Sequence, residues 1–464
     1  MQFTLPTKYW MLIVLAIWGS ALLGFGLLRL DTFGLDEGAA HALLLIWSVS
    51  DQIINSSVTF GGPDFRGLLF LPLGLYWPGS ILAAKVFTAL FMFVAAMTLY
   101  IWSRDTSSQE TALISTGLLL IVPATILQID AIGVGPYCLF LFAMGFILDK
   151  KYRASPHSIS SLYFIQMLLV ATTISLHPMG LAYPLAIAWH WYINPKSNKQ
   201  QKQVWIGLVI TAFFVTAMQT GWISIAWFSN PLNTIGIAFF GHTPLATALP
   251  SWKAGLLPIL LIAFLLFRDI RHFSDNFMLT CLILAIIIGF VAADLNWSLV
   301  AMTYLIYRGI PLIISLNSRI KSQSFAGQRG IVMAVLFIFT TIFMQAEKTY
   351  ANYVASGILA PEDEVIKAIA KEASDHDKDF LAASQWPART MVACRRDILP
   401  IPTNPVNEEQ LLKSFNKLTH MVFDHNNPKN SDLAQLLAKH ANLTETTAIL
   451  AGGVVVKVRK KAVK

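Results

Sequence analysis

The sequence predicts an α-helical membrane protein with about eleven transmembrane helices and a small C-terminal α/β domain. Three observations support this fold class. Of the 464 residues, 55% are hydrophobic and only 13% are charged, whereas soluble domains contain roughly a quarter charged residues. Apolar runs of spanning length recur through residues 1–346, and a polar tail follows over 347–464. Lys and Arg cluster in every second connection, so the net charge of +8 indicates membrane orientation rather than nucleic-acid binding.

The apolar runs define the spans. A helix needs about 20 apolar residues to cross a bilayer. The first run follows Lys8, as the core of a signal peptide would, but the many later runs favour an uncleaved helix. We expect transmembrane helices near residues 10–30, 81–102, 111–128, 131–149, 161–177, 178–193, 204–224, 252–267, 277–293, 298–316 and 331–346.

The charges in the connections predict the orientation. One set of connections carries the cations Lys8, Arg104, Lys150, Lys151, Arg153, Lys196, Lys199, Lys202, Arg268, Arg271, Arg319, Lys321 and Arg329. The alternate set, near 129–131, 176–180, 225–251 and 292–297, contains no Lys or Arg. The positive-inside rule then places the N-terminus in the cytoplasm of a multi-pass inner-membrane protein. An odd number of spans places the tail in the periplasm.

Two extramembrane regions follow from this orientation. The first outer loop, residues 31–80, contains the stretches EGAAHALLLIWSVSDQII and LLFLPLGLYWPGS, which we interpret as interfacial helices. The tail, residues 347–464, alternates short apolar runs with amphipathic segments, which predicts an α/β domain. Helices are expected at 361–375, 407–417 and 430–441, strands at 379–384, 389–394 and 419–424, and a hairpin turning at Gly452–Gly453.

Ionisable side chains gather at the predicted outer ends of the spans, and charges in the middle of spans are nearly absent. The residues are Arg29, Asp31, Asp36, Glu37, Asp64, Arg66, Lys85, Asp130, His177, His242 and Asp294. A secondary transporter would place its polar groups near the midplane, on broken helices. The outward distribution instead favours an enzyme that acts on a lipid headgroup at the outer surface.

Acids and cations in one outward site suit the transfer of a sugar from a polyprenyl phosphate. A carboxylate takes the proton of the acceptor hydroxyl, and Arg or Lys neutralises the departing phosphate. Side chains alone can neutralise a monophosphate, and the outer loops contain no Asp-x-Asp or His-Glu-x-x-His motif. We therefore expect no metal and no other cofactor. The three cysteines, Cys138, Cys281 and Cys394, are interpreted as small buried residues.

The N-terminal half resembles the GT-C class of integral-membrane glycosyltransferases, particularly bacterial relatives of protein O-mannosyltransferases and of the lipid A aminoarabinose transferase. LDEGAAH resembles the Asp–Glu pair of the family's first outer loop, which implies Asp36 as the catalytic base with Glu37 beside it. DFRGLLF lies where relatives carry a basic residue, which implies Arg66 as a phosphate contact. In PGSILAAKVFTAL, Lys85 takes the position of the relatives' arginine.

Two further motifs extend the resemblance. IDAIGVGPYCLF is similar to the segment that opens the relatives' fourth span: Tyr137 matches, Gly135 stands in place of an arginine, and Asp130 is the candidate for a second acid. SLHPMG is similar to the relatives' His-containing connection, which implies His177. The resemblance thus assigns Asp36 and Glu37 to catalysis. It assigns the donor phosphate to Arg66, Lys85, Asp130, Tyr137 and His177.

Each of these residues has a structural alternative. Asp36 and Glu37 would also suit the start of a helix beginning near Gly38, and Arg66 a lipid headgroup. Lys85 would also suit snorkelling to the interface. Asp130 would be an ordinary residue of the connection between two spans, and His177 would cap a helix end before Pro178.

The sequence as a whole predicts an inverting glycosyltransferase of the inner membrane. Its donor would be a polyprenyl-phosphate sugar and its acceptor lipid A, an envelope glycan or a protein at the periplasmic face, with membrane lipids and no nucleic acid as further partners. Two alternatives stay open: a transporter or flippase of a lipid-linked sugar, and a non-catalytic GT-C relative.

Overall fold

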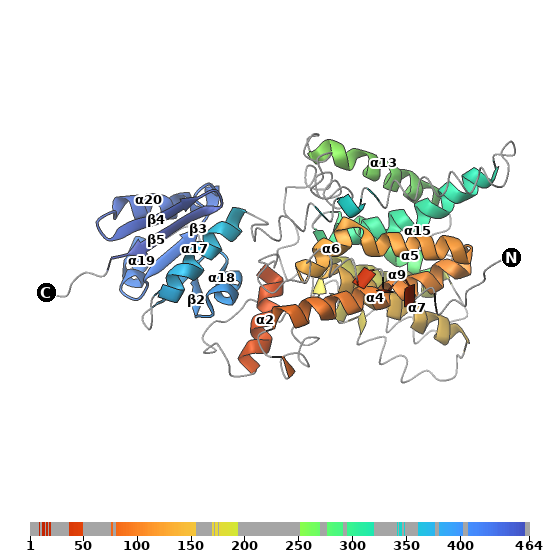
Figure 1. Cartoon of the computed structure of the whole chain (residues 1–464), viewed down its shortest axis with the longest axis horizontal. Helices are drawn as coiled ribbons and strands as arrows, with labels where there is room; N and C mark the ends of the chain where they lie inside the picture. Colours follow the sequence, from red (N-terminus) through yellow and green to blue (C-terminus); the bar gives the residue numbers. More distant parts are fainter. Residues whose placement is uncertain are drawn as a thin grey trace. The chain divides into compact units, whose positions relative to one another are not determined.

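The computed structural model describes residues 37–49, 80–154, 176–193, 251–269, 276–290, 295–319, 361–375, 380–401 and 407–459, with a few isolated residues besides (Figure 1). The chain divides into two compact units. The first unit comprises Met1–Leu28 and Lys85–Asn352, and the second comprises Arg29–Ala84 and Tyr353–Lys464. Residues of the first outer loop are thereby grouped with the C-terminal tail, whereas the sequence analysis grouped residues 31–80 with the membrane domain.

The described part of the first unit is helical. Its elements are α4 (Ile81–Thr106), α5 (Gln109–Ile121), α6 (Pro123–Asp130), α7 (Gly135–Ala154), the 3-10 helix η1 (Pro178–Leu181), α9 (Ala182–Ile193), α13 (Ser251–Asp269), α14 (Phe277–Gly289) and α15 (Leu295–Arg319). Helix α15 packs against α5, α6, α7, α13 and α14. The residues of α15 around Trp297 and Tyr304 are accordingly buried.

Only some of these helices have the length and composition of a complete span. Among the described residues, α4 and α15 qualify, and α5 with α6 makes a third if the pair counts as one span bent by 47°. The bend lies at Pro123. Proline interrupts a continuous helix because it has no backbone N–H to donate and because its ring clashes with the preceding turn. The predicted spans 81–102, 111–128, 131–149 and 298–316 thus overlie helices, while the total of about eleven stays a prediction.

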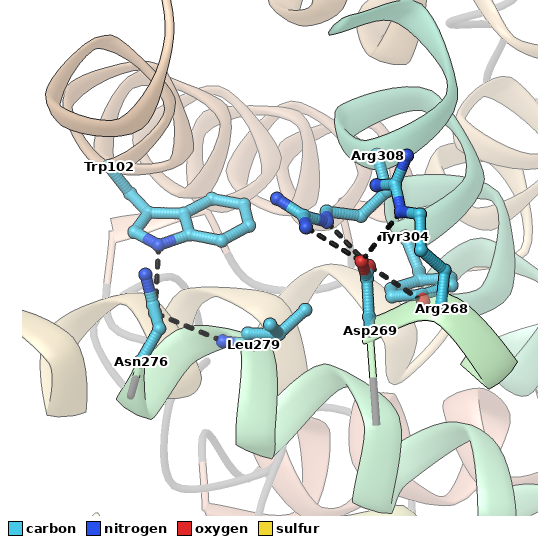
Figure 2. Close-up of polar contacts among 7 residues, drawn as sticks. All are labelled: Trp102, Arg268, Asp269, Asn276, Leu279, Tyr304 and Arg308. Atoms are coloured by element: carbon cyan, nitrogen blue, oxygen red, sulfur yellow. Dashed lines mark hydrogen bonds and ion pairs between the residues drawn. The ribbon is translucent and has the colours of Figure 1, made fainter. Parts of the chain in front are cut away.

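An ionic cluster around a buried carboxylate joins α13 to α15. Figure 2 shows the carboxylate of Asp269 between Arg308 and Arg268. Arg308 donates to it from Nε at 2.6 Å and from Nη2 at 2.8 Å, and the hydroxyl of Tyr304 donates at 3.0 Å. Arg308 lies within the predicted span 298–316, so the expectation of nearly charge-free spans overlooked it. An arginine at that depth requires a partner, which Asp269 supplies.

Asparagine 276 makes a second polar junction in Figure 2. Its side-chain oxygen caps α14 by accepting from the backbone N–H of Leu279 at 3.2 Å. The same oxygen accepts from the indole Nε1 of Trp102 on α4 at 2.9 Å. One residue therefore satisfies a free N–H at a helix start and ties that start to a neighbouring helix.

Asp269→Ala is expected to destabilise the protein by about 3 kcal/mol, because it leaves the guanidinium of Arg308 without its carboxylate. Arg268→Ala is the control: this side chain is 36% exposed and contacts the same carboxylate, so its loss should cost below about 1 kcal/mol. Denaturant unfolding of the full chain in detergent measures both. Equal losses in the two variants would contradict the assignment of Arg308 as the principal partner.

The second unit is built on a five-stranded sheet. Its elements are α2 (Glu37–Val49), α17 (Pro361–Asp375), β1 (Ala382–Ser384), α18 (Pro387–Cys394), β2 (Ile398–Pro400), α19 (Glu408–Phe415), β3 (His420–Phe423), the 3-10 helix η3 (Pro428–Asn430), α20 (Ser431–Lys439), β4 (Thr444–Leu450) and β5 (Gly453–Val458). The strand order is β2-β1-β3-β5-β4. Strand β1 is parallel to β2 and β3, whereas β5 is antiparallel to β3 and β4.

Helices cover both faces of this sheet. Side chains of α19 and α20, among them Leu411 and Leu437, form one core with Val454, Val456 and Val458 of β5. Helix α17 packs against β3, β4, β5 and α18. Because alternate residues of a strand point to opposite faces, β5 contributes to both cores, and the predicted α/β character of the tail is confirmed.

Most of the predicted elements of the tail are present. The helices at 361–375, 407–417 and 430–441 correspond to α17, α19 and α20, and the hairpin is formed by β4 and β5. The prediction of a strand at 389–394 is wrong, because this stretch belongs to α18. Pro387 starts that helix, and the buried Ala388, Met391 and Val392 recur at helical spacing.

Candidate functional site

Several predicted site residues lie outside the described residues. These are Asp36 and Arg66, together with Arg29, Asp31, Asp64, His242 and Asp294. The structure describes the remaining candidates, which are Glu37, Lys85, Asp130, Tyr137 and His177. Three of the five come together in the first unit.

Lys85 and Asp130 form a buried ion pair between α4 and α6. The Nζ atom of Lys85 contacts Oδ1 of Asp130, and the two side chains are 0% and 1% exposed. Lys85 therefore does not snorkel to the membrane interface, which was its structural alternative. Removing two charges from water costs several kcal/mol per ion before their attraction offsets it. A buried ion pair therefore adds little net stability to a fold. Ionisable residues within a membrane domain instead indicate a functional site.

Tyr137 of α7 contacts helix α4 one turn after Lys85. Its hydroxyl is 2.7 Å from Oγ1 of Thr88, which follows Lys85 by three residues and so shares its face of α4. The ring centroid of Tyr137 is 5.0 Å from that of Phe91 on the same helix. Helices α4, α6 and α7 thus hold Lys85, Asp130 and Tyr137 in one apolar interior.

Two amide side chains fix the turn after Asp130. The Asn296 side-chain oxygen accepts from the backbone N–H of Val134 at 2.8 Å and of Gly135 at 3.1 Å. The Gln128 oxygen also accepts from Gly135, at 3.1 Å. Gln128 and Asn296 are not among the residues predicted from the sequence, although amides at the ends of apolar segments are a signal that could have found them.

The same turn stores backbone strain. Ile132 has φ of +51°, a left-handed conformation that is unfavourable for a β-branched residue and costs on the order of 1–3 kcal/mol. A Cβ at Gly135 would lie 2.9 Å from Oε1 of Gln128 and 3.0 Å from Cδ2 of Leu299, so a larger residue there would require these two side chains to shift. The position where relatives carry an arginine is thus closely surrounded by side chains in this protein.

His177 lies at the start of η1, where its Nδ1 accepts from the backbone N–H of Met179 at 3.2 Å. This is the capping arrangement that was its structural alternative, and η1 packs against α14. A contact between His177 and the donor phosphate stays a prediction.

Glu37 belongs to the second unit and starts α2. Its carboxylate accepts hydrogen bonds from the backbone N–H groups of Ala388, at 2.6 Å, and Arg389, at 3.2 Å, at the start of α18. Glu37 therefore caps a helix of the tail, which gives it a structural role beside the predicted catalytic one. Nothing in the sequence signals a cap across 351 residues.

The described cysteines are free and buried, as expected of small core residues. Burial raises the pKa of the Cys394 thiol to about 12, so this side chain stays protonated at neutral pH. Among the described ranges no three His, Cys, Asp or Glu side chains gather as a metal site. Independence from metals stays a prediction.

Comparison with solved structures identifies the fold. ArnT from Cupriavidus metallidurans in the apo state superposes with a TM-score of 0.57 at 12% identity, over 97% of this chain and 98% of that chain. Its complex with undecaprenyl phosphate gives 0.56 at 13% identity, with the same coverage. The apo oligosaccharyltransferase of Archaeoglobus fulgidus gives 0.52 at 12% identity, over 90% of this chain and 70% of that chain.

A scan of protein-family models and a search of curated proteins find no match. At these low identities the structural likeness carries the fold alone. The chain has the fold of the GT-C integral-membrane glycosyltransferases, as its motifs predicted.

Proposed function

We propose that this protein is an inverting glycosyltransferase of the inner membrane. It takes a sugar from a polyprenyl-phosphate donor at the periplasmic face and passes it to lipid A, an envelope glycan or a protein. The observation that carries the proposal is the buried Lys85–Asp130 pair within a GT-C fold. The undecaprenyl phosphate bound by the ArnT of Cupriavidus metallidurans supports a donor of this chemical class.

The chemistry is a single displacement. The acceptor hydroxyl transfers its proton to Asp36 while its oxygen forms a bond to the anomeric carbon of the sugar. The bond from that carbon to the phosphate oxygen breaks, and its electron pair leaves with the polyprenyl phosphate. One displacement inverts the configuration at the anomeric carbon.

The cations act on the leaving group. The phosphate gains a negative charge as its bond to the sugar breaks, and a cation in an apolar site stabilises that charge more than in water. Lys85 is such a cation, and Asp130 takes one of the three N–H donors of its ammonium group. Asp130 thus holds Lys85 in place, and Arg66 is proposed as the second cation.

Purified protein in detergent tests the proposal. Given a polyprenyl-phosphate sugar and an envelope extract, it should release polyprenyl phosphate and label an acceptor. A transporter or flippase needs two compartments, so it would release none under these conditions. Absence of release by folded protein would overturn the proposal. Mass analysis of lipid A, surface glycan and exported proteins from a deletion strain would identify the sugar and its acceptor.

Removal of divalent metals is expected to leave the rate of release unchanged within about twofold, because side chains neutralise the monophosphate. The assay is repeated after EDTA treatment and dialysis, with magnesium added back as the control. A loss on chelation that magnesium restores would contradict the metal-independent mechanism.

A further inference from the structure

We infer that the ionic cluster around Asp269 is a binding site for an anionic phospholipid. Arg268 and Arg308 bind the phosphate of the lipid headgroup, and the exposed apolar face of α13 contacts the acyl chains. The inference does not rest on the proposed glycosyl transfer, because the cluster lies at the other end of the helices from the Lys85–Asp130 pair.

The cluster lies where several helices of the first unit begin or end (Figure 2). Asp269 is the last residue of α13, and Asn276 caps the start of α14. Trp102, which donates to Asn276, lies close to the end of α4. The ring centroid of Trp102 is 6.0 Å from that of Tyr307, the residue before Arg308. Helix ends in a membrane protein lie near the level of the lipid headgroups, so a phosphate there is within reach of an arginine side chain.

This level is far from the proposed donor site. Lys85 lies near the start of α4, and the rise of an α-helix puts about 25 Å between it and Trp102. That length is most of the roughly 30 Å hydrocarbon core of a bilayer. Arg268 also belongs to the connections that the positive-inside rule predicts to be cytoplasmic. The cytoplasmic leaflet carries the anionic lipids, which attract Lys and Arg side chains at its surface.

The cluster has an excess of positive charge, and its cations are its accessible part. Two guanidinium groups contact one carboxylate. The side chains of Arg268 and Arg308 are 36% and 23% exposed, whereas that of Asp269 is 1% exposed. An anion that approaches the cluster therefore meets the two guanidinium groups and is shielded from the carboxylate behind them.

Both arginines keep N–H groups for a ligand. A guanidinium has five N–H donors. Arg268 donates to Asp269 from Nε alone, at 3.1 Å, and Arg308 donates from Nε and Nη2. Within the described ranges no further acceptor contacts Nη1 of Arg308 or either Nη atom of Arg268. Because Asp269 holds one edge of each guanidinium, the remaining N–H groups are oriented for the paired hydrogen bonds that arginine makes to phosphate oxygens.

The face of α13 that leads to Arg268 favours a lipid over a free phosphate. Leu260, Phe264 and Arg268 recur at intervals of four residues and so share one face of the helix. Leu260 is 58% exposed and Phe264 is 57% exposed. In a membrane such an apolar row contacts acyl chains. The row ends in a cation, and this order matches a phospholipid, whose phosphate follows its acyl chains.

Titration of the full-length protein with phosphatidylglycerol in detergent, followed by native mass spectrometry, tests the site. Phosphatidylcholine with the same acyl chains is the comparison lipid, because its headgroup has a phosphate but no net charge. Wild-type protein should bind phosphatidylglycerol at least about fivefold more tightly, the effect of one Arg near the membrane surface. Arg268→Gln should remove this preference, and Arg268→Lys should keep most of it, since it restores the charge.

Arg104→Gln is the matched control. Arg104 lies near the end of α4, is 47% exposed, and precedes a carboxylate, Asp105, as Arg268 precedes Asp269. Asp105, however, is 37% exposed and would itself repel a phosphate. The affinity of Arg104→Gln for phosphatidylglycerol should therefore stay within about twofold of wild type. An equal loss in Arg104→Gln and Arg268→Gln would assign the preference to general surface charge and overturn the inference.

Phe264→Ala and inorganic phosphate distinguish a lipid from a free anion. Phe264→Ala should weaken the binding of both lipids by about threefold or more, because the acyl chains lose an apolar contact. An excess of inorganic phosphate should not displace phosphatidylglycerol. Displacement by phosphate, with no effect of Phe264→Ala, would make the site one for a free anion and overturn the inference.

Two further results would overturn the inference. One is equal affinity of the wild-type protein for the two lipids. The other is wild-type affinity for phosphatidylglycerol in Arg268→Gln that is folded, as judged by its unfolding transition in detergent.

Discussion

Asp36→Asn is expected to abolish sugar transfer, with a loss of about 10²- to 10⁴-fold, the range that one general base contributes. The substitution is nearly isosteric, but the amide cannot take the proton of the acceptor hydroxyl. The measurement is the transfer rate of membranes or purified protein at matched expression. Donor binding should persist, because the phosphate contacts lie on other residues.

Asp64→Asn serves as the matched control, since Asp64 is another acid of the first outer loop. Its transfer rate should stay within about twofold of wild type, the change expected where no proton is transferred. Full activity in Asp36→Asn would remove Asp36 from the mechanism. Loss of activity in both variants would show that the loop tolerates no change of charge, and would leave the choice of base unsupported.

Replacing either member of the Lys85–Asp130 pair is expected to destabilise the protein by about 3–5 kcal/mol, because the remaining charge is buried without its partner. Replacing both by apolar residues, as in Lys85→Met with Asp130→Leu, should restore stability to within about 1–2 kcal/mol of wild type. The double variant should nevertheless lose transfer, because the cation for the leaving phosphate is absent. Unfolding in detergent and the release of polyprenyl phosphate measure the two effects.

Tyr137→Phe tests the neighbouring side chain, which the resemblance assigns to the donor phosphate. It removes the hydroxyl that lies 2.7 Å from Oγ1 of Thr88 and should lower the stability of the protein by about 1 kcal/mol. Its transfer rate should fall less than that of the double variant. A stable double variant that keeps full activity would contradict the proposed role of Lys85. A double variant as unstable as either single one would contradict the description of the two residues as a pair.

The transmembrane spans could be predicted from the sequence wherever composition alone determines the secondary structure. A run of apolar residues such as Ile81–Thr106 has one stable arrangement in a membrane, namely a helix, because only a helix satisfies its backbone within the segment. The break at Pro123 was less visible, since the predicted span 111–128 passes through it. In the tail, residues 389–394 combine helical spacing with strand-forming residues, and the proline at 387 was the signal that should have decided for α18.

The site was predictable as a set of residues but not as contacts. The resemblance marks Lys85 and Asp130 separately, and the 45 residues between them carry no signal of their pairing. The contact of Glu37 with α18 and that of Asp269 with Arg308 are likewise tertiary. An unpaired charge in an apolar segment predicts that a partner exists, and only the fold determines which residue it is.

The most direct test of the account is an experimental structure of the protein with undecaprenyl phosphate bound in a lipid nanodisc. The quantity to measure is the distance from Nζ of Lys85 to the nearest phosphate oxygen. We expect a hydrogen-bond distance of about 2.7–2.9 Å, with Asp36 facing the same bound donor. A phosphate bound away from Lys85, with Asp36 buried elsewhere, would contradict the proposed mechanism.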